Sequence, residues 1–388
     1  MRYGGKLLWL LLVLFFAAPA LPVQAAEPDI GASSAIVIEA STGRVVYEKN
    51  ADRREYPASL TKMMTCILGL ELGDPAASVT ISGDAAAVED SYLGLAAGDK
   101  LSLQELLTGM MLESDNGAAA AVSQYLASSR AAFADKMNRK AQELGATQTH
   151  FHNPNGLPDP EHYSTARDLA KIAAGGMRLP QFRQIVGTRE QTIRCQQPAG
   201  KTLRATNTNA LLGKYPGMTG IKTGWTEAAG GCLAAAARRG GVELIAVVLH
   251  SPTMETRFSD AAALLDYSFG QVQAEKGVDQ ARTEKTLLVR GGKDYKVSAH
   301  PAADVYFPLI GGEGAEHYSV RYDIPLVVQA PVQAGDTVGS LIVCYDGEEV
   351  ERIDMLADSA IEPGFSLLSF FVGVGNGILQ GLQGLFAR

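Results

Sequence analysis

Hydrophobic and polar positions alternate near the start of the chain in a pattern that predicts a β-hairpin. Residues 34–38 and 44–47 have the two-residue spacing of strands, and residues 41–43, Ser-Thr-Gly, provide the turn between them. Beyond Pro57 the apolar spacing changes to that of a helix, which we expect to end near Gly73. A hairpin followed by a core helix therefore opens the predicted fold.

Helical and strand-like runs then follow one another up to about residue 275. Helical spacing recurs in residues 103–112, 118–126, 131–144, 165–174 and 257–269. Ser102 is the expected N-cap of the first of these runs. Three apolar runs have the length of central strands, namely residues 217–223, 232–237 and 244–249. With the hairpin, this order predicts an α/β (α+β) domain over residues 26–275, in which a helical cluster is inserted into an antiparallel sheet.

The composition changes after about residue 275. Residues 276–284 are polar and typical of a linker, whereas the next segment has short alternating runs separated by Gly and Pro. These runs predict strands at residues 286–290, 295–299, 305–309, 318–322, 326–330 and 338–345. We therefore expect a small all-β domain over residues 280–355. Because it contains no catalytic cluster, we expect a spacer or interaction role.

The N-terminus, residues 1–25, is typical of a signal peptide. Arg2 and Lys6 form a charged region, and residues 7–18 are apolar but short for a membrane span. Residues 23–25, Val-Gln-Ala, provide small side chains for cleavage. An uncleaved anchor is the alternative. The sequence therefore predicts an exported protein.

The C-terminal segment, residues 360–388, has the composition of a membrane anchor. Residues 363–387 contain no charged residue, and their small or polar positions recur every three or four residues, as on one face of a helix. A helix lying in the membrane interface and a spanning helix both fit this pattern. A buried core helix is the third interpretation.

Composition narrows the classes of function. The 388 residues suffice for two domains, and 34 Lys and Arg against 42 Asp and Glu give a net charge of −8, which argues against a nucleic-acid partner. The four cysteines are scattered along the chain and lie mostly in apolar segments, so we expect buried free thiols, with one disulfide as the alternative. They are Cys66, Cys195, Cys232 and Cys344. Because no carboxylate or cysteine cluster accompanies them, we expect no metal site at His150, His152 and His162.

The candidate chemistry begins with Ser59 and Lys62, which are three residues apart at the start of the first helix. Residues at this spacing are neighbours on one helix face, so the amine can serve the hydroxyl as its base. Ser59 could instead be a simple N-cap. A lysine in the first turn is unusual if Ser59 is only an N-cap, because the positive end of a helix disfavours a cation such as Lys62. The same effect lowers the pKa of the Lys62 amine.

Two further motifs follow in order along the chain. Ser114-Asp115-Asn116 interrupts two helical runs, and Lys222-Thr223-Gly224 ends a strand-like run. Ser-x-x-Lys, Ser-Asp-Asn and Lys-Thr-Gly in this order are the signature of penicillin-binding proteins and class A β-lactamases. Over most of residues 30–275, and more loosely beyond, the chain resembles a low-molecular-weight penicillin-binding protein, a serine-type D-alanyl-D-alanine carboxypeptidase of peptidase family S11.

The resemblance implies a penicillin-recognising serine transpeptidase/β-lactamase-like fold, followed by the small β domain and a C-terminal amphipathic anchor on the outer face of the cytoplasmic membrane. It also implies the substrate, a peptidoglycan stem pentapeptide, with β-lactams as covalent inhibitors and no cofactor. Ser59 would attack the penultimate D-alanine carbonyl and Lys62 would take its proton. Ser114 would relay that proton to the leaving amine. Asn116 would hold the substrate amide and orient Lys62.

The same resemblance implies the substrate-binding residues. Lys222 would keep the site electropositive, which lowers the pKa of Lys62 and attracts the substrate carboxylate. Thr223 would donate a hydrogen bond to that carboxylate, and Gly224 would let the strand backbone approach the substrate closely. The backbone N–H groups of Ser59 and Trp225 would bind the oxyanion. Arg257 would pair with the terminal carboxylate. The ordinary alternatives are a solvated charge at Lys222 and a helix-capping ion pair at Arg257.

Three positions depart from common patterns. Asp115 stands where many family members have glycine, Trp225 stands where several have histidine, and Glu161 lacks the surrounding motif of a class A deacylation glutamate. Two other functions therefore stay open, a class A-like β-lactamase and a non-catalytic penicillin-sensing or wall-binding protein.

Overall fold

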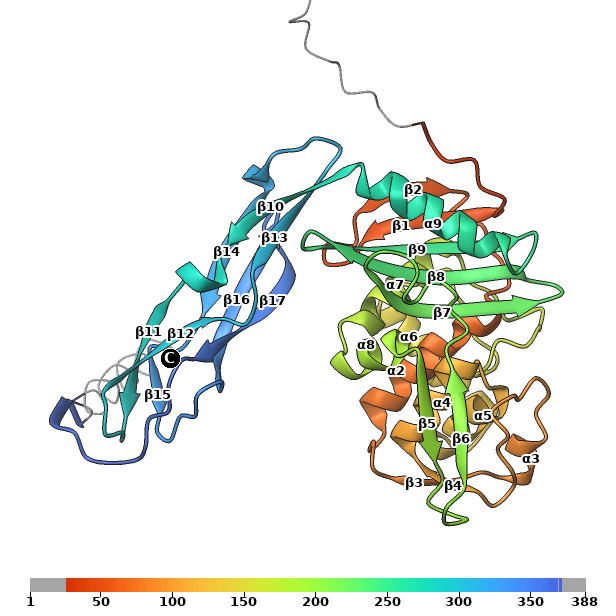
Figure 1. Ribbon diagram of the computed structural model, residues 1–388, viewed down its shortest axis with the longest axis horizontal. Helices are drawn as coiled ribbons and strands as arrows, with labels where there is room; N and C mark the ends of the chain where they lie inside the picture. The colour runs from red at the N-terminus through yellow and green to blue at the C-terminus, as the bar shows by residue number, and fades with distance from the viewer. Residues whose placement is uncertain (1–25, 369, 372–388) are drawn as a thin grey trace, which may run out of the picture.

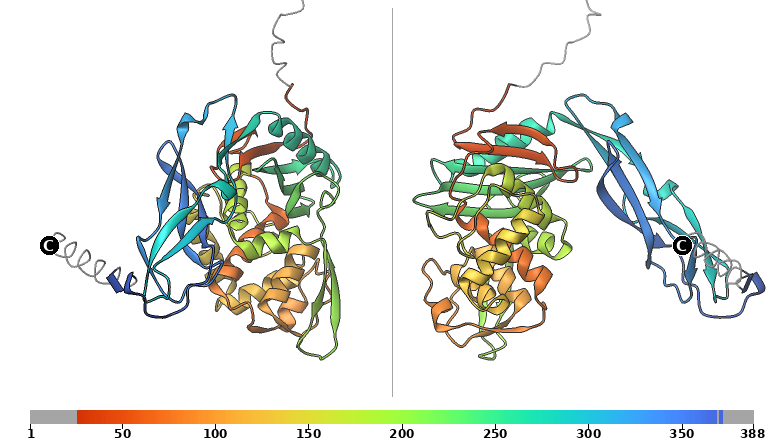
Figure 2. Two further views of the ribbon diagram at one scale, coloured as in Figure 1. Left: turned by 60° about the vertical axis from the view of Figure 1, so that its left-hand side comes forward. Right: turned by 180° about the vertical axis from the view of Figure 1, so that it is seen from behind.

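The structure is a computed structural model that describes residues 26–368, 370 and 371. The predicted signal peptide and most of the predicted anchor lie outside the described residues. Two parts stand side by side, a mixed domain of sheet and helices and a β-rich domain that extends away from it (Figures 1 and 2). The two parts correspond to the two domains expected from the sequence.

The first domain is built on a five-stranded sheet in the order β2-β1-β9-β8-β7, in which every neighbouring pair is antiparallel. Its strands are β1 (Ser34–Glu39), β2 (Val45–Lys49), β7 (Met218–Thr226), β8 (Gly230–Arg239) and β9 (Val242–Ser251). The predicted hairpin and the three predicted central strands are confirmed. Because β9 pairs with β1, the two ends of this domain meet inside one sheet.

Both faces of the sheet are buried, as β1 shows. Ala35 and Val37 pack in a cluster with α9 (Thr256–Phe269), whereas Ile36 and Ile38 belong to the cluster that contains the remaining helices. Successive side chains of a strand point to opposite faces, so a strand covered on both sides has apolar residues throughout. The result is three layers, with α9 on one face and the helical cluster on the other (Figure 1).

The helical cluster surrounds α2 (Lys62–Leu72), which ends at Gly73 as predicted and packs against α4, α5, α6 and α7. The helices besides α2 are α3 (Gly83–Ala86), α4 (Leu103–Glu113), α5 (Asn116–Leu126), α6 (Arg130–Glu143), α7 (Ala166–Met177) and α8 (Pro180–Gly187). Ser102 caps α4 by accepting a hydrogen bond from the Glu105 N–H, as expected. The helical runs named from the sequence are confirmed, whereas α3 and α8 were not predicted.

Two short ribbons lie outside the main sheet and were also not predicted. They are β3 (Ser78–Thr80) with β4 (Lys100–Ser102), and β5 (Glu190–Arg194) with β6 (Thr202–Thr206). The β5–β6 ribbon runs from the sheet down along the helices (Figure 1). Only one residue of β5 and one of β6 are buried, Ile193 and Ala205, so both strands lack the apolar content of a core strand.

The second domain contains a six-stranded sheet in the order β14-β16-β17-β12-β11-β15 and the pair β10-β13. The strands are β10 (Val272–Val278), β11 (Lys285–Arg290), β12 (Lys296–Pro301), β13 (Val305–Ile310), β14 (Tyr318–Asp323), β15 (Val327–Gln329), β16 (Thr337–Tyr345) and β17 (Glu348–Ala357). The predicted small β domain is confirmed. The predicted linker at residues 276–284 is wrong in its first part, because β10 runs through Val278 and pairs with β13.

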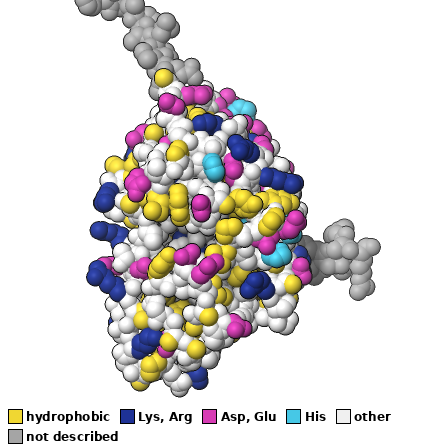
Figure 3. Space-filling view, turned by 90° about the vertical axis from the view of Figure 1, so that its right-hand side faces the viewer, with side chains coloured by type: hydrophobic (Ala, Val, Ile, Leu, Met, Phe, Trp, Pro, Cys, Tyr) yellow, Lys and Arg dark blue, Asp and Glu magenta, His cyan; other side chains and the backbone are white. Residues whose placement is uncertain are grey.

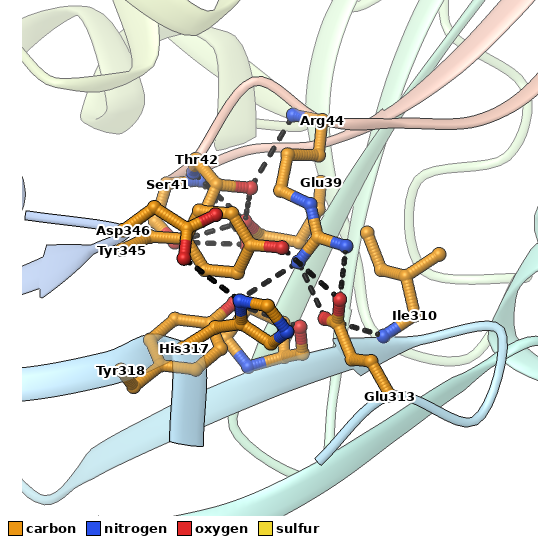
Figure 4. A network of polar contacts seen from close by, with 11 residues as sticks. Glu39, Ser41, Thr42, Arg44, Ile310, Glu313, His317, Tyr318, Tyr345 and Asp346 are labelled. Atoms are coloured by element: carbon orange, nitrogen blue, oxygen red, sulfur yellow. Dashed lines mark hydrogen bonds and ion pairs between the residues drawn. The ribbon is translucent and has the colours of Figure 1, made fainter. Parts of the chain in front are cut away.

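The two domains are joined by a network of polar contacts around Arg44, which follows the β1–β2 turn (Figure 4). Its guanidinium makes two hydrogen bonds to Glu313, of 2.5 and 2.6 Å, and lies 4.2 Å from the centre of the Tyr345 ring. Glu313 also accepts hydrogen bonds from Tyr345 and from the Ile310 N–H. The carboxylate is therefore fully engaged, and the pKa of Glu313 is lowered despite its partial burial.

The cysteines, the helices and the surface charges of the described chain can be compared with the sequence. All four cysteines are buried and free, as favoured from the sequence. Over residues 26–368, 370 and 371, none of the helices combines the length and the apolar character that a membrane crossing needs. On the face shown in Figure 3, Lys and Arg side chains are spread among Asp and Glu.

We predict that Arg44 and Glu313 are energetically coupled. A double-mutant cycle of Arg44→Ala and Glu313→Ala should give a coupling free energy of about 1–2 kcal/mol, because two charge-assisted hydrogen bonds are made in a mostly buried position. Denaturant unfolding of the wild type, the two single variants and the double variant measures this coupling free energy. The exposed pair Arg204 and Glu190 is the matched control and should couple much more weakly. Equal coupling in the two cycles would contradict the assignment of Arg44 as an interdomain contact.

Candidate active site

Ser59 lies in a tight 3₁₀ turn, Ala58–Thr61, and α2 begins only at Lys62. This differs from the expectation of an α-helix starting near Ala58. Ala58 has a positive φ of 47°, which is unusual for a residue with a side chain. Side chains three residues apart eclipse each other in a 3₁₀ turn, so this turn places Ser59 Oγ 2.8 Å from Lys62 Nζ. The N-cap alternative for Ser59 is wrong, since no side chain caps either helix start.

The Lys62 amine is completely buried and has three oxygen partners. They are Ser59 Oγ at 2.8 Å, Asn116 Oδ1 at 2.6 Å and the backbone carbonyl of Asn155 at 2.8 Å. Burial lowers the pKa of Lys62 to about 7, while the carboxylates of Asp115 and Asp90 oppose that change. The pKa of Lys62 is lowered as predicted, but the main cause is burial, in place of the helix N-terminus and Lys222.

The second motif forms the junction between α4 and α5. Ser114 has φ of +62°, so the chain turns sharply there, and Asp115 then caps α5 by accepting a hydrogen bond from the Ala118 N–H at 2.7 Å. Asp115 also accepts from the Leu93 N–H at 2.8 Å. The carboxylate that distinguishes this motif from the glycine form therefore holds the turn together and fixes a neighbouring loop.

Asn116 is the first residue of α5 and connects this turn to Lys62. Its Oδ1 accepts from the Lys62 amine, and its Nδ2 donates to the carbonyl of Glu89 at 2.9 Å. Both ends of the side-chain amide are thus held, which fixes its orientation. Within the described part of the chain, the Ser114 hydroxyl makes no hydrogen bond to Ser59 or Lys62.

A loop formed by residues 153–157 supplies the third partner of Lys62, the Asn155 carbonyl. Asn153 Oδ1 accepts from the Gly156 N–H at 2.7 Å, and Thr65 Oγ1 donates to the Pro154 carbonyl at 2.6 Å. Gly156 has φ of +92°, and a Cβ there would lie 1.8 Å from the Ala58 carbonyl oxygen. The loop is therefore pressed against the serine turn. The contribution of Asn155 was missed, because a backbone carbonyl leaves no signal in residue type.

His162 contacts the last residue of the serine turn, Thr61. Its Nε2 lies 2.7 Å from Thr61 Oγ1, and its Nδ1 accepts from the His152 N–H at 3.0 Å. Burial lowers the pKa of His162 to about 4, so the ring is neutral near pH 7. Among residues 26–368, 370 and 371, no group of His, Cys, Asp and Glu side chains has the arrangement of a metal site.

The opposite wall of the site is β7, the edge strand of the sheet. Lys222 is buried, and its amine donates to the Thr223 carbonyl at 3.0 Å. Burial lowers the pKa of Lys222 well below its ordinary value, and charge repulsion from Lys62 and Arg257 lowers it further. A Cβ on Gly224 would lie 3.1 Å from Ser59 N. The solvated-charge alternative for Lys222 is therefore wrong, and the lack of a side chain at Gly224 lets β7 lie close to the Ser59 backbone.

Arg257 reaches the same strand from α9. Its Nη1 donates to the Gly224 carbonyl at 2.6 Å, and its Nε has no hydrogen-bond partner within the described residues. Burial lowers the pKa of Arg257. Because the guanidinium makes no salt bridge in the part of the chain described here, the ion-pair alternative is wrong. Trp225 follows at the end of the strand and is 42 % exposed.

A serine hydroxyl beside a buried lysine amine, between a sheet edge and a helical cluster, is the arrangement of an acyl-transferring serine enzyme that needs no histidine. The model of the family described as D-alanyl-D-alanine carboxypeptidase, peptidase S11, matches residues 22–253. The model described as penicillin-binding protein 5, C-terminal domain, matches residues 275–363. The chain belongs to peptidase family S11, the serine-type D-alanyl-D-alanine carboxypeptidases.

Relatives span nearly the whole chain. The D-alanyl-D-alanine carboxypeptidase DacF of Bacillus subtilis is 33 % identical and covers 89 % of this chain and 91 % of its own. The crystal structure of DacD from Francisella tularensis superposes with a TM-score of 0.64 at 26 % identity, over 94 % of this chain and 100 % of that one. Penicillin-binding protein 5 from Haemophilus influenzae gives 0.62 at 28 % identity, over 87 % and 99 %. The family implies a peptidoglycan peptide substrate and penicillin binding.

Proposed function

We propose that this protein releases the terminal D-alanine from peptidoglycan stem pentapeptides through an acyl-enzyme on Ser59. The observation that carries the proposal is the buried Lys62 amine, whose pKa of about 7 allows it to act as a base 2.8 Å from the Ser59 hydroxyl. An amine with the ordinary pKa of lysine would be protonated at neutral pH and could not accept the serine proton.

The partners of Lys62 determine where its lone pair points. The Asn116 side-chain oxygen and the Asn155 carbonyl can only accept hydrogen bonds, so they take both N–H groups of a neutral amine. The lone pair is then directed at Ser59 Oγ, whose hydroxyl donates to it. Protonating the amine would place a third N–H there instead, so the same geometry is active in one protonation state and inactive in the other.

The proposed chemical steps begin with this pair of side chains. Ser59 Oγ adds to the carbonyl carbon of the penultimate D-alanine while Lys62 takes the hydroxyl proton. The backbone N–H groups of Ser59 and Trp225 stabilise the oxyanion. The C–N bond then breaks while the protonated Lys62 gives its proton to Ser114 Oγ, and Ser114 gives its own hydroxyl proton to the leaving D-alanine amine. Water finally hydrolyses the acyl-enzyme.

The terminal carboxylate of the substrate supplies the negative charge that this site lacks. The buried basic side chains Lys222 and Arg257 have no carboxylate partner among the described residues, and Thr223 follows Lys222 on β7. A guanidinium and a hydroxyl together bind a carboxylate by charge and by direction. Substrates without a free C-terminal carboxylate should therefore bind poorly.

β-Lactams should acylate Ser59 and leave slowly, which separates this function from that of a β-lactamase. The Glu161 side chain is exposed and makes no contact with Ser59 or Lys62. Glu161 therefore does not take the place of a deacylation glutamate at the serine.

We predict that wild-type protein releases D-alanine from a diacyl-lysyl-D-alanyl-D-alanine peptide, and that Ser59→Ala lowers kcat by about a thousand-fold or more, because the covalent step is lost. Free D-alanine is measured with a coupled oxidase assay. Ser259→Ala, an exposed serine on α9, is the matched control and should keep wild-type activity. Rapid penicillin turnover without D-alanine release would favour the β-lactamase alternative, and a stable adduct without release the sensor alternative.

The protein is further proposed to be exported and attached to the outer face of the cytoplasmic membrane through its C-terminal segment. The described start of that segment supports this location, since five large apolar side chains there are exposed, Phe365, Leu367, Leu368, Phe370 and Phe371. The segment leaves the β domain beside Gly292, which pairs with Pro363. This attachment would make the β domain the spacer between membrane and active site.

We predict that a chain ending at Gly364 becomes soluble while it keeps its activity. The truncation preserves the bond from the Gly364 N–H to the Gly291 carbonyl, so the β domain keeps its last contact. Immunoblots of membrane fractions washed at high salt compare the membrane association of truncated and full-length protein. D-alanine release compares their activity. Truncated protein that still pellets with membranes would contradict the anchor proposal.

A further inference from the structure

We propose that Thr208 is a positioning residue that aims the Thr223 hydroxyl at the terminal carboxylate of the substrate. The two Oγ1 atoms lie 2.6 Å apart. Thr208 lies outside all three sequence motifs, in the connection between β6 and β7. The inference rests on the proposed function, in which Thr223 donates a hydrogen bond to that carboxylate.

The segment that carries Thr208 is held from two sides by the asparagines that flank it. Asn207 Nδ2 donates to the carbonyls of Val186 and Thr188, at 3.1 and 2.9 Å, at the end of α8. Asn209 Nδ2 is buried and donates to the Gly220 carbonyl in β7 at 2.9 Å. Both side-chain oxygens also accept backbone N–H groups two residues further on. These bonds give the segment one defined conformation.

The same segment also contacts the second motif. The Thr208 N–H donates to the Leu112 carbonyl at 3.1 Å, and the Thr206 N–H donates to the Glu113 side chain. Leu112 and Glu113 are the last residues of α4, directly before the Ser114 turn. Carbonyls at a helix C-terminus lack partners within the helix, and this segment satisfies one of them. Thr208 is therefore placed at a fixed point between the Ser114 turn and β7.

The proton count of the two hydroxyls gives the pair its function. Each hydroxyl has one proton to donate. If Thr223 donates to the substrate carboxylate, it cannot also donate to Thr208, so Thr208 must donate to Thr223. A hydroxyl that accepts one hydrogen bond donates a second one more strongly. Thr208 thus selects the rotamer and the proton direction of Thr223 before the substrate arrives.

Exposure separates the two roles. Thr223 is only 4 % exposed on β7, whereas Thr208 beside it is exposed. An exposed threonine tolerates replacement, so removing its hydroxyl should leave the fold intact. Thr208→Val keeps the shape of the side chain and removes the hydroxyl alone, and Thr208→Ser keeps the hydroxyl.

The test compares kcat and KM for a diacyl-lysyl-D-alanyl-D-alanine peptide across four proteins, the wild type, Thr208→Val, Thr208→Ser and Thr202→Val. Thr202 is an exposed threonine on β6 whose hydroxyl has no partner among the described residues, so it is the matched control. We expect Thr208→Val to lower kcat/KM roughly three- to ten-fold, mainly through KM, which corresponds to the net strength of one hydrogen bond. Thr208→Ser should restore most of the loss.

Three outcomes would overturn the inference. They are wild-type kinetics in Thr208→Val, an equal loss in Thr202→Val, and a loss in Thr208→Val that Thr208→Ser does not restore. A thermal midpoint that falls in Thr208→Val with unchanged KM would also count against it, because that result indicates a purely structural residue. If the wild type itself releases no D-alanine, the proposed function fails instead, so the two failures are distinguishable.

Discussion

The active site depends on keeping a lysine amine out of water. Lys62, Lys222 and Arg257 are buried close to one another, and none of them forms a salt bridge within the described chain. Desolvation disfavours the charged form of each, and the repulsion between them adds to that effect. The site therefore makes Lys62 a base without a histidine, and it leaves a positive region that a substrate carboxylate can neutralise.

Four segments that are distant in sequence create this environment. The 3₁₀ turn brings Ser59 to Lys62, the Ser114 turn presents Asn116, the Asn155 loop covers the amine, and β7 closes the opposite side. Each contact is short, and glycines at positions 156 and 224 permit the closest approaches. The sheet and the helical cluster position these segments, and the β domain is joined to them through Arg44.

Much of this arrangement could be predicted from residue types. The spacing of Ser59 and Lys62, the order of the three motifs and the periodicity of the main strands and helices all correspond to features of the structure. The backbone carbonyl of Asn155 could not be predicted, because every residue has one. β17 was missed because most of its residues are not buried and four of its ten are acidic, so it lacks an apolar pattern. Thr208 was missed because its partner is fifteen residues away in sequence.

The most direct test of this account is the titration of Lys62, followed by NMR of ¹³Cε-labelled lysine in the mature protein, with its signal assigned from its loss in Lys62→Met. The folded pKa lies below the unfolded one, so the amine should lose its proton as the pH rises through about 7, well before an ordinary lysine. The acylation rate with benzylpenicillin should rise over the same pH range. A Lys62 signal that stays protonated up to about pH 10 would contradict the account.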